Sequence, residues 1–372
     1  MDHGSSHTKL DPFDPDFYAD MHTRLRQLRA SDPVHFIEPL RIWCTTTYSD
    51  SATVFRDPRF VKRGWVEMVD KSFGGNTILG DFLFFKDPPE HTRLRRLVQK
   101  NMRHSTAAAL IERSDAVVTA LVGELRRAGG WRSRTGLRMA NPNTGDRCTL
   151  RRARHRCRHD RRMGPRPVPG DRYDPARLSA RRATRPERDV RLLRSAHSEI
   201  ADQRRRVHLV IGGYDTTAHQ IASGAYLLLT NPAALAQLRA DWSLLDNTVE
   251  EILRCEPSAP LLGREAAVDL TIHGKEIKAG DFIGPLVAAA NRDPERFDDP
   301  DSFQIAPSRP AHLSFGIGSR RCLGEHLARV NIKTAMRQLF SDDVGLTLDD
   351  HTPTWRSSLL FRGLAGLPVT VG

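Results

Sequence analysis

Cys322 is the residue of this chain whose surroundings are best suited to chemistry. It lies in a glycine-rich loop, and Gly316, Gly318 and Gly324 allow tight turns and remove side-chain bulk beside the sulfur. Two preceding arginines and the start of a helical pattern place positive charge nearby, which favours the thiolate over the thiol. Such a thiolate is a nucleophile or a metal ligand, and no histidine or aspartate beside it is suited to be the base partner of a nucleophile. A buried structural thiol is the ordinary alternative for a lone cysteine.

The spacing around this cysteine is specific. The sequence reads Phe315-x-x-Gly318-x-x-x-Cys322-x-Gly324, which resembles, with no position missing, the cysteine loop of the cytochrome P450 family of haem-thiolate monooxygenases. The resemblance implies the family's fold, mainly α with small β-sheets, and haem b as the cofactor. It also implies that Cys322 is the axial ligand of the haem iron, with Phe315 and Gly324 among the cofactor-binding residues. A thiolate in this position favours O–O cleavage.

Four basic residues elsewhere fit the same cofactor. Asp87 and the two prolines after it suit the start of a helix on which His91 and Arg95, four residues apart, share a face. The residues alone are equally consistent with a solvated basic helix face. By resemblance, both bind a haem propionate, and the arginine fork suits a carboxylate. Arg264 and Arg320 are implied as further propionate contacts, the latter at a position where the family often has histidine.

An apolar helical pattern over residues 207–229 contains Gly212-Gly213-Tyr214-Asp215-Thr216. Two glycines inside a helix cost about 1 kcal/mol each relative to alanine, which indicates a local purpose. A helix crossing with close packing is one explanation. The resemblance implies another, in which the helix opens beside the haem at Gly213 to admit O2. Thr216 then hydrogen-bonds the oxygen and Asp215 relays protons, so these two are the expected catalytic residues.

Glu251 and Arg254 lie three residues apart on one face of a predicted helix. A surface ion pair of small energetic value is the simple interpretation. By resemblance, they are a buried structural pair, whose third member is an arginine before the cysteine loop. Arg309 is the candidate for that role.

The surrounding pattern predicts the elements that position these residues. Residues 33–37 and 42–48 are rich in β-branched and aromatic side chains and predict strands. Ser49 and Asp50 suit the cap of a short helix ending near Phe55. Alternation after Arg264, with glycine turns, predicts a hairpin sheet. In the family, residues corresponding to 61–85 contact substrate.

The middle of the chain has a different character. Residues 131–206 contain 23 arginines, no lysine and 8 acidic residues, a net charge of +15 against +12 for the whole chain, so the remainder sums to −3. No sustained period of 2 or 3.6 runs through this segment, which cannot bury enough apolar surface to order itself. A nucleic-acid-binding insert is one interpretation. A metal site is another, although the spacing fits no common zinc pattern; its ligands would be Cys148, His155, Cys157 and His159.

We favour a third interpretation, in which residues 131–206 are the product of translation in a shifted reading frame that begins near Gly130 and ends between about Ser195 and Arg206. The segment then replaces the family's mid-chain helices and substrate lid. On this hypothesis the chain is a single P450 domain, 1–372, with an aberrant, poorly folded insert. An inactive remnant of the family remains the alternative to an active enzyme.

Composition and length limit the partners. Five cysteines at irregular spacing do not suggest a disulfide framework, and no long apolar stretch free of charge predicts a membrane span. A cytoplasmic enzyme is expected. A chain of 372 residues has no room for a flavin domain, so the electrons for O2-dependent hydroxylation of a small organic substrate are expected from a ferredoxin and its reductase. Arg320, Arg321 and Arg329 form a basic face on which an acidic redox partner could dock.

Overall fold

The computed structural model describes most of the chain on either side of the arginine-rich segment. It describes residues 10–72, 83–99, 112, 116, 119, 212–213, 215–305, 310–341, 344–349 and 353–371. These residues belong to one compact unit formed by Met1–Arg138 and Val210–Gly372. The described residues do not include residues 131–206, on which the shifted-frame hypothesis depends. They do not include Arg309 either.

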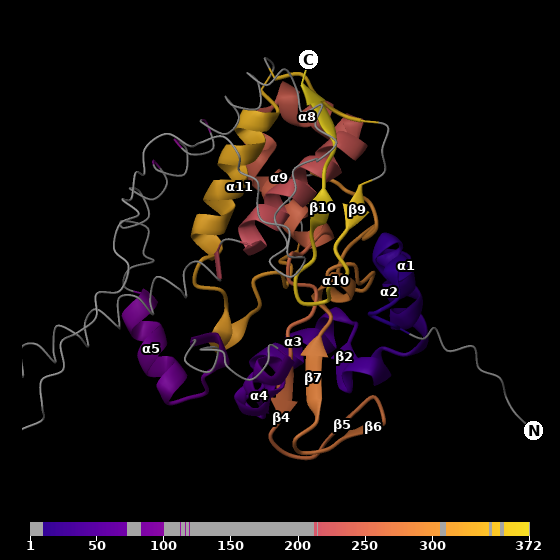
Figure 1. Ribbon diagram of the computed structural model, residues 1–372, viewed down its shortest axis with the longest axis vertical. Helices are drawn as coiled ribbons and strands as arrows, with labels where there is room; N and C mark the ends of the chain where they lie inside the picture. Colours follow the sequence, from indigo (N-terminus) through magenta and orange to yellow (C-terminus); the bar gives the residue numbers. More distant parts are fainter. Residues whose placement is uncertain are drawn as a thin grey trace, which may run out of the picture. The chain divides into compact units, whose positions relative to one another are not determined.

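A five-stranded sheet joins the beginning of the chain to its second half (Figure 1). Its strand order is β1 (Val34–Ile37), β2 (Ile42–Thr45), β7 (Phe282–Pro285), β4 (Arg264–Ala266) and β3 (Phe60–Val61). β1 and β2 form the antiparallel pair that their β-branched and aromatic residues predict, and β2 runs parallel to β7. The sheet therefore fixes the segment around Arg264 against strands more than 200 residues earlier.

Short helices surround this sheet. α1 (Pro15–Ala19) and α2 (Met21–Ser31) precede it, and α2 packs against α10 (Val287–Ala290). α3 (Tyr48–Arg56) is capped by Thr47, whose hydroxyl accepts a hydrogen bond from the backbone N–H of Asp50. The expected cap at Ser49 and Asp50 is therefore wrong by two residues, because the threonine already has the extended backbone that a cap requires.

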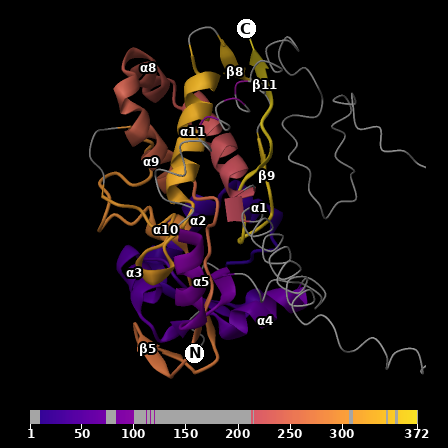
Figure 2. The same cartoon turned by 90° about the vertical axis from the view of Figure 1, so that its left-hand side faces the viewer.

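The largest hydrophobic core lies among helices of the second half. Residues 215–230 are helical and are followed by α8 (Pro232–Ala240), α9 (Leu245–Cys255) and α11 (Glu325–Leu339). Figure 2 shows α8, α9 and α11 gathered at one end of this unit. Gly224 allows the close approach here, since a Cβ at this position would lie 3.0 Å from the Ile252 side chain. No described atom lies within 4 Å of a Cβ built on Gly212 or Gly213, so close packing against the described residues does not explain those two glycines.

The remaining elements are short. β5 (Leu270–Ile272) and β6 (Lys275–Ile277) form the predicted hairpin, which turns at His273 and Gly274, both with positive φ. Near the C-terminus, β8 (Leu346–Leu348) pairs with β11 (Val369–Val371), and β9 (Thr354–Trp355) pairs with β10 (Leu364–Gly366). The other helical segments are η1 (Glu38–Leu40), α4 (Arg63–Ser72), η3 (Leu83–Phe85), α5 (Glu90–Gln99), η6 (Trp242–Leu244) and η7 (Gly318–Arg320). The described chain is mainly α-helical with small sheets, as the sequence predicts.

Candidate functional site

The cysteine loop is a defined turn before α11. The backbone N–H of Cys322 donates to the Phe315 carbonyl at 2.9 Å, so the loop closes on itself. Gly316 and Gly318 have φ angles of +63° and +76°, which side chains on L-residues rarely allow. A Cβ on Gly318 would also lie 3.4 Å from the Phe55 carbonyl oxygen. These two glycines are therefore required by the backbone path, and that path presents Cys322 just before the helix.

Cys322 itself sits in a mixed electrostatic environment. Its side chain has exposed surface, yet protein atoms crowd it closely enough that burial raises the pKa of the thiol. The backbone N–H of Gly324 and the guanidinium groups of Arg95 and Arg329 lower that pKa, whereas Glu325 raises it. The expected preference for thiolate is therefore wrong for the chain by itself, because desolvation outweighs the positive charge. A coordinated metal ion reverses this balance, since it deprotonates a thiol ligand outright.

A second feature is a group of buried basic side chains, called the cation cluster below, in which the imidazole of His91 accompanies Lys62, Arg264 and Arg320. Lys62, His91 and Arg264 are each at most 3% exposed, and Arg320 is close enough to affect the pKa of all three. Arg320 forms an ion pair with Asp87 through Nη2, while its Nη1 is buried without a hydrogen-bond partner among the described residues. The cluster thus gathers three of the four expected propionate contacts and keeps one donor unused.

The charges in this cluster do not balance. Burial, followed by the charge of Arg320, lowers the pKa of Arg264 to about 9. Burial, Arg320 and Arg95 lower the pKa of His91 to about 4, and burial and Arg264 lower that of Lys62. Asp87 is the one carboxylate, among the described residues, that opposes these shifts. Buried cations need paired anions, so the cluster fits a ligand that brings carboxylates, as haem does.

Arg95 is the fourth expected propionate contact and lies differently. It is half-buried, and its Nη2 donates to the carbonyl of Arg321 at 2.7 Å. Its charge acts on both His91 and Cys322. Arg95 therefore connects α5 to the cysteine loop and places the cation cluster next to the sulfur.

Lys62 was not identified from the sequence. Its Nζ donates to the Gly263 carbonyl at 2.6 Å and lies 3.8 Å above the ring of Phe84. Nothing local distinguishes this lysine from a surface residue. It is buried because β3 pairs with β4, a contact between segments 201 residues apart.

Asp87 also has a different role from the expected one. α5 begins at Glu90, and the Asp87 carboxylate accepts two hydrogen bonds of 3.0 Å from the backbone N–H of Lys62. With the ion pair to Arg320, these contacts occupy the carboxylate. Asp87 therefore connects three segments of the cluster through its carboxylate, and its backbone carbonyl accepts from the His91 N–H at 2.9 Å at the start of α5.

The expected catalytic pair lies in the first described turn of the central helix. Asp215 is exposed, and the Thr216 hydroxyl donates to the Gly212 carbonyl at 2.9 Å, one helical turn earlier. One turn beyond Asp215, His219 is buried and accepts a hydrogen bond from Arg356 at 3.0 Å. The structure gives no contact between this pair and Cys322 within the part of the chain that it describes.

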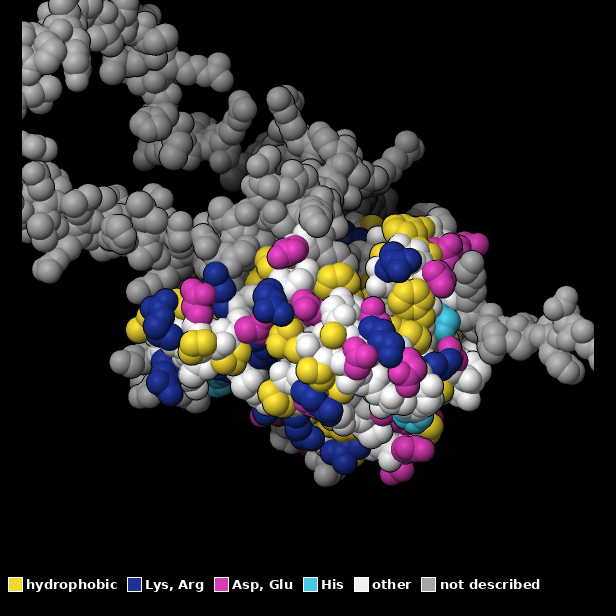
Figure 3. Space-filling view, turned by 90° about the horizontal axis from the view of Figure 1, so that it is seen from below, with side chains coloured by type: hydrophobic (Ala, Val, Ile, Leu, Met, Phe, Trp, Pro, Cys, Tyr) yellow, Lys and Arg dark blue, Asp and Glu magenta, His cyan; other side chains and the backbone are white. Residues whose placement is uncertain are grey.

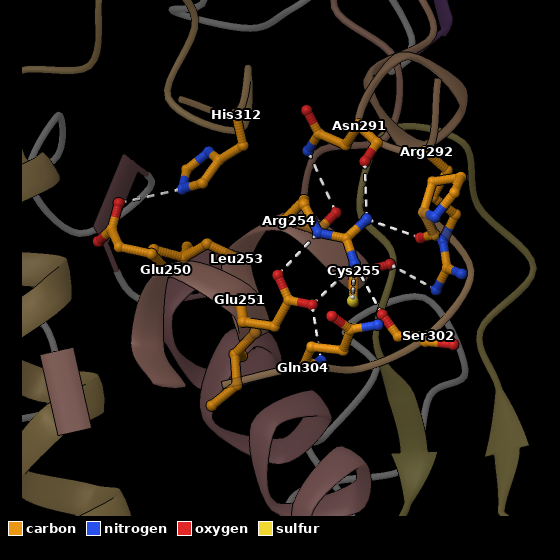
Figure 4. Close-up of polar contacts among 12 residues, drawn as sticks. Glu250, Glu251, Leu253, Arg254, Cys255, Asn291, Arg292, Ser302, Gln304 and His312 are labelled. Atoms are coloured by element: carbon orange, nitrogen blue, oxygen red, sulfur yellow. Dashed lines mark hydrogen bonds and ion pairs between the residues drawn. The ribbon is translucent and has the colours of Figure 1, made fainter. Parts of the chain in front are cut away.

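Glu251 and Arg254 are a buried, two-pronged ion pair (Figure 4). Their Nε–Oε2 and Nη2–Oε1 distances are 2.7 and 2.8 Å, and both side chains are at most 2% exposed. Arg254 also donates to the carbonyls of Asn291, Pro300 and Ser302. The simple interpretation as a surface ion pair is therefore wrong.

Asn291, which the sequence did not single out, joins this pair to the cysteine loop. Its side chain donates to the Arg254 carbonyl and to the Ser314 hydroxyl at 3.2 and 2.8 Å. It also accepts from the backbone N–H of Leu313 at 2.8 Å. The residue is fully buried, so these three bonds satisfy its amide inside the protein.

The mainly helical fold, the cysteine loop and the buried basic side chains fit a protein that binds a cofactor with carboxylate groups, and comparisons with known proteins identify the family. The family model "Cytochrome P450" matches residues 204–342. Cytochrome P450 monooxygenase PikC of Streptomyces venezuelae is 31% identical over 389 residues, covering 95% of this chain and 92% of the relative. The 6-deoxyerythronolide B hydroxylase of Saccharopolyspora erythraea is 30% identical over 405 residues, covering 96% and 97%. The crystal structure of CalO2 superposes with a TM-score of 0.72 and 26% identity, covering 98% and 99%.

The chain belongs to the cytochrome P450 family. It is accordingly a monooxygenase, an oxidoreductase whose cofactor is haem and whose reaction involves an organic substrate, O2 and a redox partner. Within the described residues, no helix is long and apolar enough to cross a membrane. The same residues contain no cluster of three histidine, cysteine or acidic side chains arranged to hold a metal ion.

Proposed function

We propose that this protein hydroxylates an organic substrate in the cytoplasm, with O2 and electrons from a ferredoxin-type donor, and with Cys322 as the axial ligand of its haem. The observation that carries the proposal is the connection through Arg95 between the cysteine loop and a buried cluster of cations that lacks enough anions. Two relatives are named for the reaction type, the 6-deoxyerythronolide B hydroxylase and the mycinamicin IV hydroxylase/epoxidase.

The cation cluster has the role of binding the haem carboxylates. Arg264, Arg320 and His91 would hold the two carboxylates, and Lys62 would assist them because it is buried and close enough for the charges of Arg264 and Arg320 to act on it. Binding replaces mutual repulsion by ion pairing, which brings the pKa values of these groups back toward their ordinary range. Phe315 and Gly324 complete the loop beside the sulfur, where a Cβ on Gly324 would lie 4.0 Å from Sγ.

The central helix supplies protons. When bound, the haem provides the redox chemistry that activates O2 for insertion into a C–H bond. Asp215 is exposed, so its carboxylate can exchange protons with water. The Thr216 hydroxyl can pass a proton on once it leaves the Gly212 carbonyl. Gly213 leaves space at this turn because it has no side chain.

The redox partner docks beside the cysteine loop. Of the three arginines expected there, Arg321 is exposed, whereas Arg320 is mostly buried and Arg329 is held by two carboxylates. Arg93 and Arg96 are exposed on α5, the helix that Arg95 joins to the loop. Figure 3 shows acidic and basic side chains interspersed on one face of the molecule, so the attraction of an acidic partner is local.

The direct test is spectroscopic and needs no knowledge of the substrate. Purified protein is supplied with haem, reduced and exposed to CO, and the absorption band is compared between the natural chain and Cys322→Ser. We expect a band at the thiolate-ligated position for the natural chain and its loss in the variant. A natural chain that takes up haem only with a shifted, non-thiolate band would contradict the role of Cys322.

The same preparation distinguishes the alternatives. An inactive remnant would take up no haem at all, whereas a nucleic-acid-binding protein would show DNA affinity that falls steeply with salt. Hydroxylation is then measured by mass spectrometry with ferredoxin, its reductase and a panel of organic substrates. Asp215→Asn is expected to slow product formation while leaving the CO band unchanged.

A further inference from the structure

We propose that Arg329 is the positioning residue that holds the Cys322 loop and sets the charge beside its sulfur, an inference that rests on the proposed role of Cys322. Arg329 lies in α11, seven residues after the cysteine, and is one-quarter exposed. Its guanidinium contacts three separate segments: α9, the first turn of α11, and the cysteine loop.

Two carboxylates fix the orientation of the Arg329 guanidinium. Its Nε and Nη2 donate to Oε1 and Oε2 of Glu250 at 2.6 and 3.0 Å, a two-pronged pair with α9. Its Nη1 donates to Glu325 at 2.9 Å. Burial opposes the charged form of Arg329, but the hydrogen bonds to both carboxylates outweigh it and raise the pKa of Arg329. The positive charge is therefore permanent, and the planar fork has a fixed orientation.

The held guanidinium lies over the ring of Phe315, with its central carbon 4.6 Å from the ring centroid. The Phe315 carbonyl accepts the hydrogen bond of the Cys322 N–H, so the ring under Arg329 belongs to the residue that closes the loop. A cation stacked on an aromatic ring contributes stability that lysine, a point charge on a flexible stem, reproduces poorly. Arg329 thus acts on the cysteine backbone through Phe315.

His312 supports the same arrangement from the other end of the loop. Its Nδ1 accepts from the backbone N–H of Ser314 at 3.2 Å, which leaves Nε2 to face Glu250 at 3.3 Å (Figure 4). Burial opposes ionisation of Glu250, yet contacts with His312 and Arg329 outweigh it and lower the pKa of Glu250 to about 2. Glu250 therefore stays ionised and holds both Arg329 and the start of the loop.

The second consequence is electrostatic. The guanidinium of Arg329 places one positive charge beside the cysteine loop, over the ring of Phe315, and the carboxylate of Glu325 places a negative charge three residues after Cys322. Arg321, which is half-exposed, also binds Glu325 at 2.6 Å. Removal of Arg329 leaves Glu250 with His312 and Glu325 with Arg321, so the loop loses one positive charge, and the more negative potential makes addition of an electron to the iron less favourable. The reduction potential of the haem should fall.

The test compares Arg329→Gln, Arg329→Lys and Arg337→Gln with the natural chain. Arg337 is the matched control, because it lies on the same helix about 12 Å further along the axis and stacks on Trp242 at 3.9 Å. Far-UV circular dichroism verifies folding of each variant. Three quantities are then measured: amide hydrogen exchange of residues 312–324 without haem, the rate of haem loss, and the reduction potential.

Arg329→Gln should accelerate exchange in the loop and haem loss by about tenfold to a hundredfold and lower the potential. Arg329→Lys should keep the potential near that of the natural chain but show the faster exchange, because it retains charge without the planar stack. Glu325→Gln should raise the potential. Arg337→Gln should match the natural chain in all three measurements.

The inference is overturned if Arg329→Gln and Arg337→Gln behave alike, or if Arg329→Lys restores slow exchange fully. A natural chain that takes up no haem instead contradicts the proposed function. The exchange measurement, which needs no haem, still decides whether Arg329 holds the loop, so the two failures can be told apart.

Discussion

Among the buried charged side chains that the structure describes, the groups around Arg254 and Arg264 differ in how far they are paired. Arg254 meets Glu251 through two bonds and three backbone carbonyls through others. Arg264 is almost as deeply buried, but it donates to a single carbonyl and faces Arg320 and Lys62. Both guanidinium groups are removed from water, so the two groups differ in how many hydrogen bonds and opposite charges offset that desolvation cost.

The comparison separates structural charge from binding charge. The Arg254 group is complete within the protein, which is what a scaffold under the cysteine loop requires. The Arg264 group remains electrostatically incomplete until anionic groups arrive, so part of its folding cost is recovered only on binding. Burial alone does not distinguish the Arg254 group from the Arg264 group, whereas the hydrogen-bond and ion-pair partners of each arginine do.

The largest expected effect is on the completed group. Glu251→Ala leaves Arg254 as an unpaired buried charge, which costs about 3–5 kcal/mol of stability, a large share of the total for a typical protein. Urea unfolding followed by circular dichroism measures it. Glu295→Ala, at an exposed position, is the control and should change stability by less than about 0.5 kcal/mol. Equal stability of the two variants would remove the basis of the comparison.

The opposite behaviour is expected at Arg264. Arg264→Gln relieves repulsion with Arg320, so the stability of the haem-free chain should not decrease. It should lose a charge-assisted bond to a haem carboxylate, about 1.5–3 kcal/mol, or roughly tenfold to a hundredfold in haem affinity. Haem titration and urea unfolding of the same samples measure both quantities. A destabilised haem-free variant with unchanged haem affinity would place Arg264 in the structural class.

Lys62 should behave as a weaker member of the binding group. Lys62→Met keeps the apolar stem under Phe84 and removes a buried charge, so the haem-free chain should retain its stability. Haem affinity should fall about fivefold, because a lysine contributes one undirected charge. Lys278→Met, at an exposed site, serves as the control in the same titration. Unchanged affinity in Lys62→Met would exclude Lys62 from the carboxylate site.

The smallest effect is a pH dependence at His91. Its pKa is lowered to about 4 in the folded haem-free chain, against 6.5 as the ordinary value. The unfolded chain therefore binds more protons, and stability falls as pH decreases from about 6.5 toward 4. His91→Gln should reduce this slope and His273→Gln, at an exposed site, should not. Unfolding curves at several pH values give the slopes, and identical slopes for the natural chain and His91→Gln would contradict the low pKa.

Local pattern was sufficient for much of the fold. β-branched and aromatic runs predicted β1 and β2, and glycine turns predicted the β5–β6 hairpin, because strand pairing between neighbours depends on nearby residues. The cap of α3 was misplaced, since Thr47 and Ser49 are chemically alike and only the backbone angle selects between them. Pairing of β2 with β7 and of β3 with β4 could not be predicted, because those partners lie more than 200 residues apart.

The spacing from Phe315 to Gly324 was sufficient by itself to indicate the family, and the family implies haem as the cofactor. This was possible because the backbone path of the loop and the position of the sulfur depend on ten consecutive residues. Burial and charge compensation were decided by tertiary structure alone. In the folded chain Lys62, which follows β3, is buried, the carboxylate of Asp87 forms an ion pair with Arg320, and the pKa of Cys322 is raised despite the nearby arginines. The burial of a side chain and the charges that face it depend on segments from distant parts of the sequence. Neither can therefore be predicted from one stretch of residues at a time.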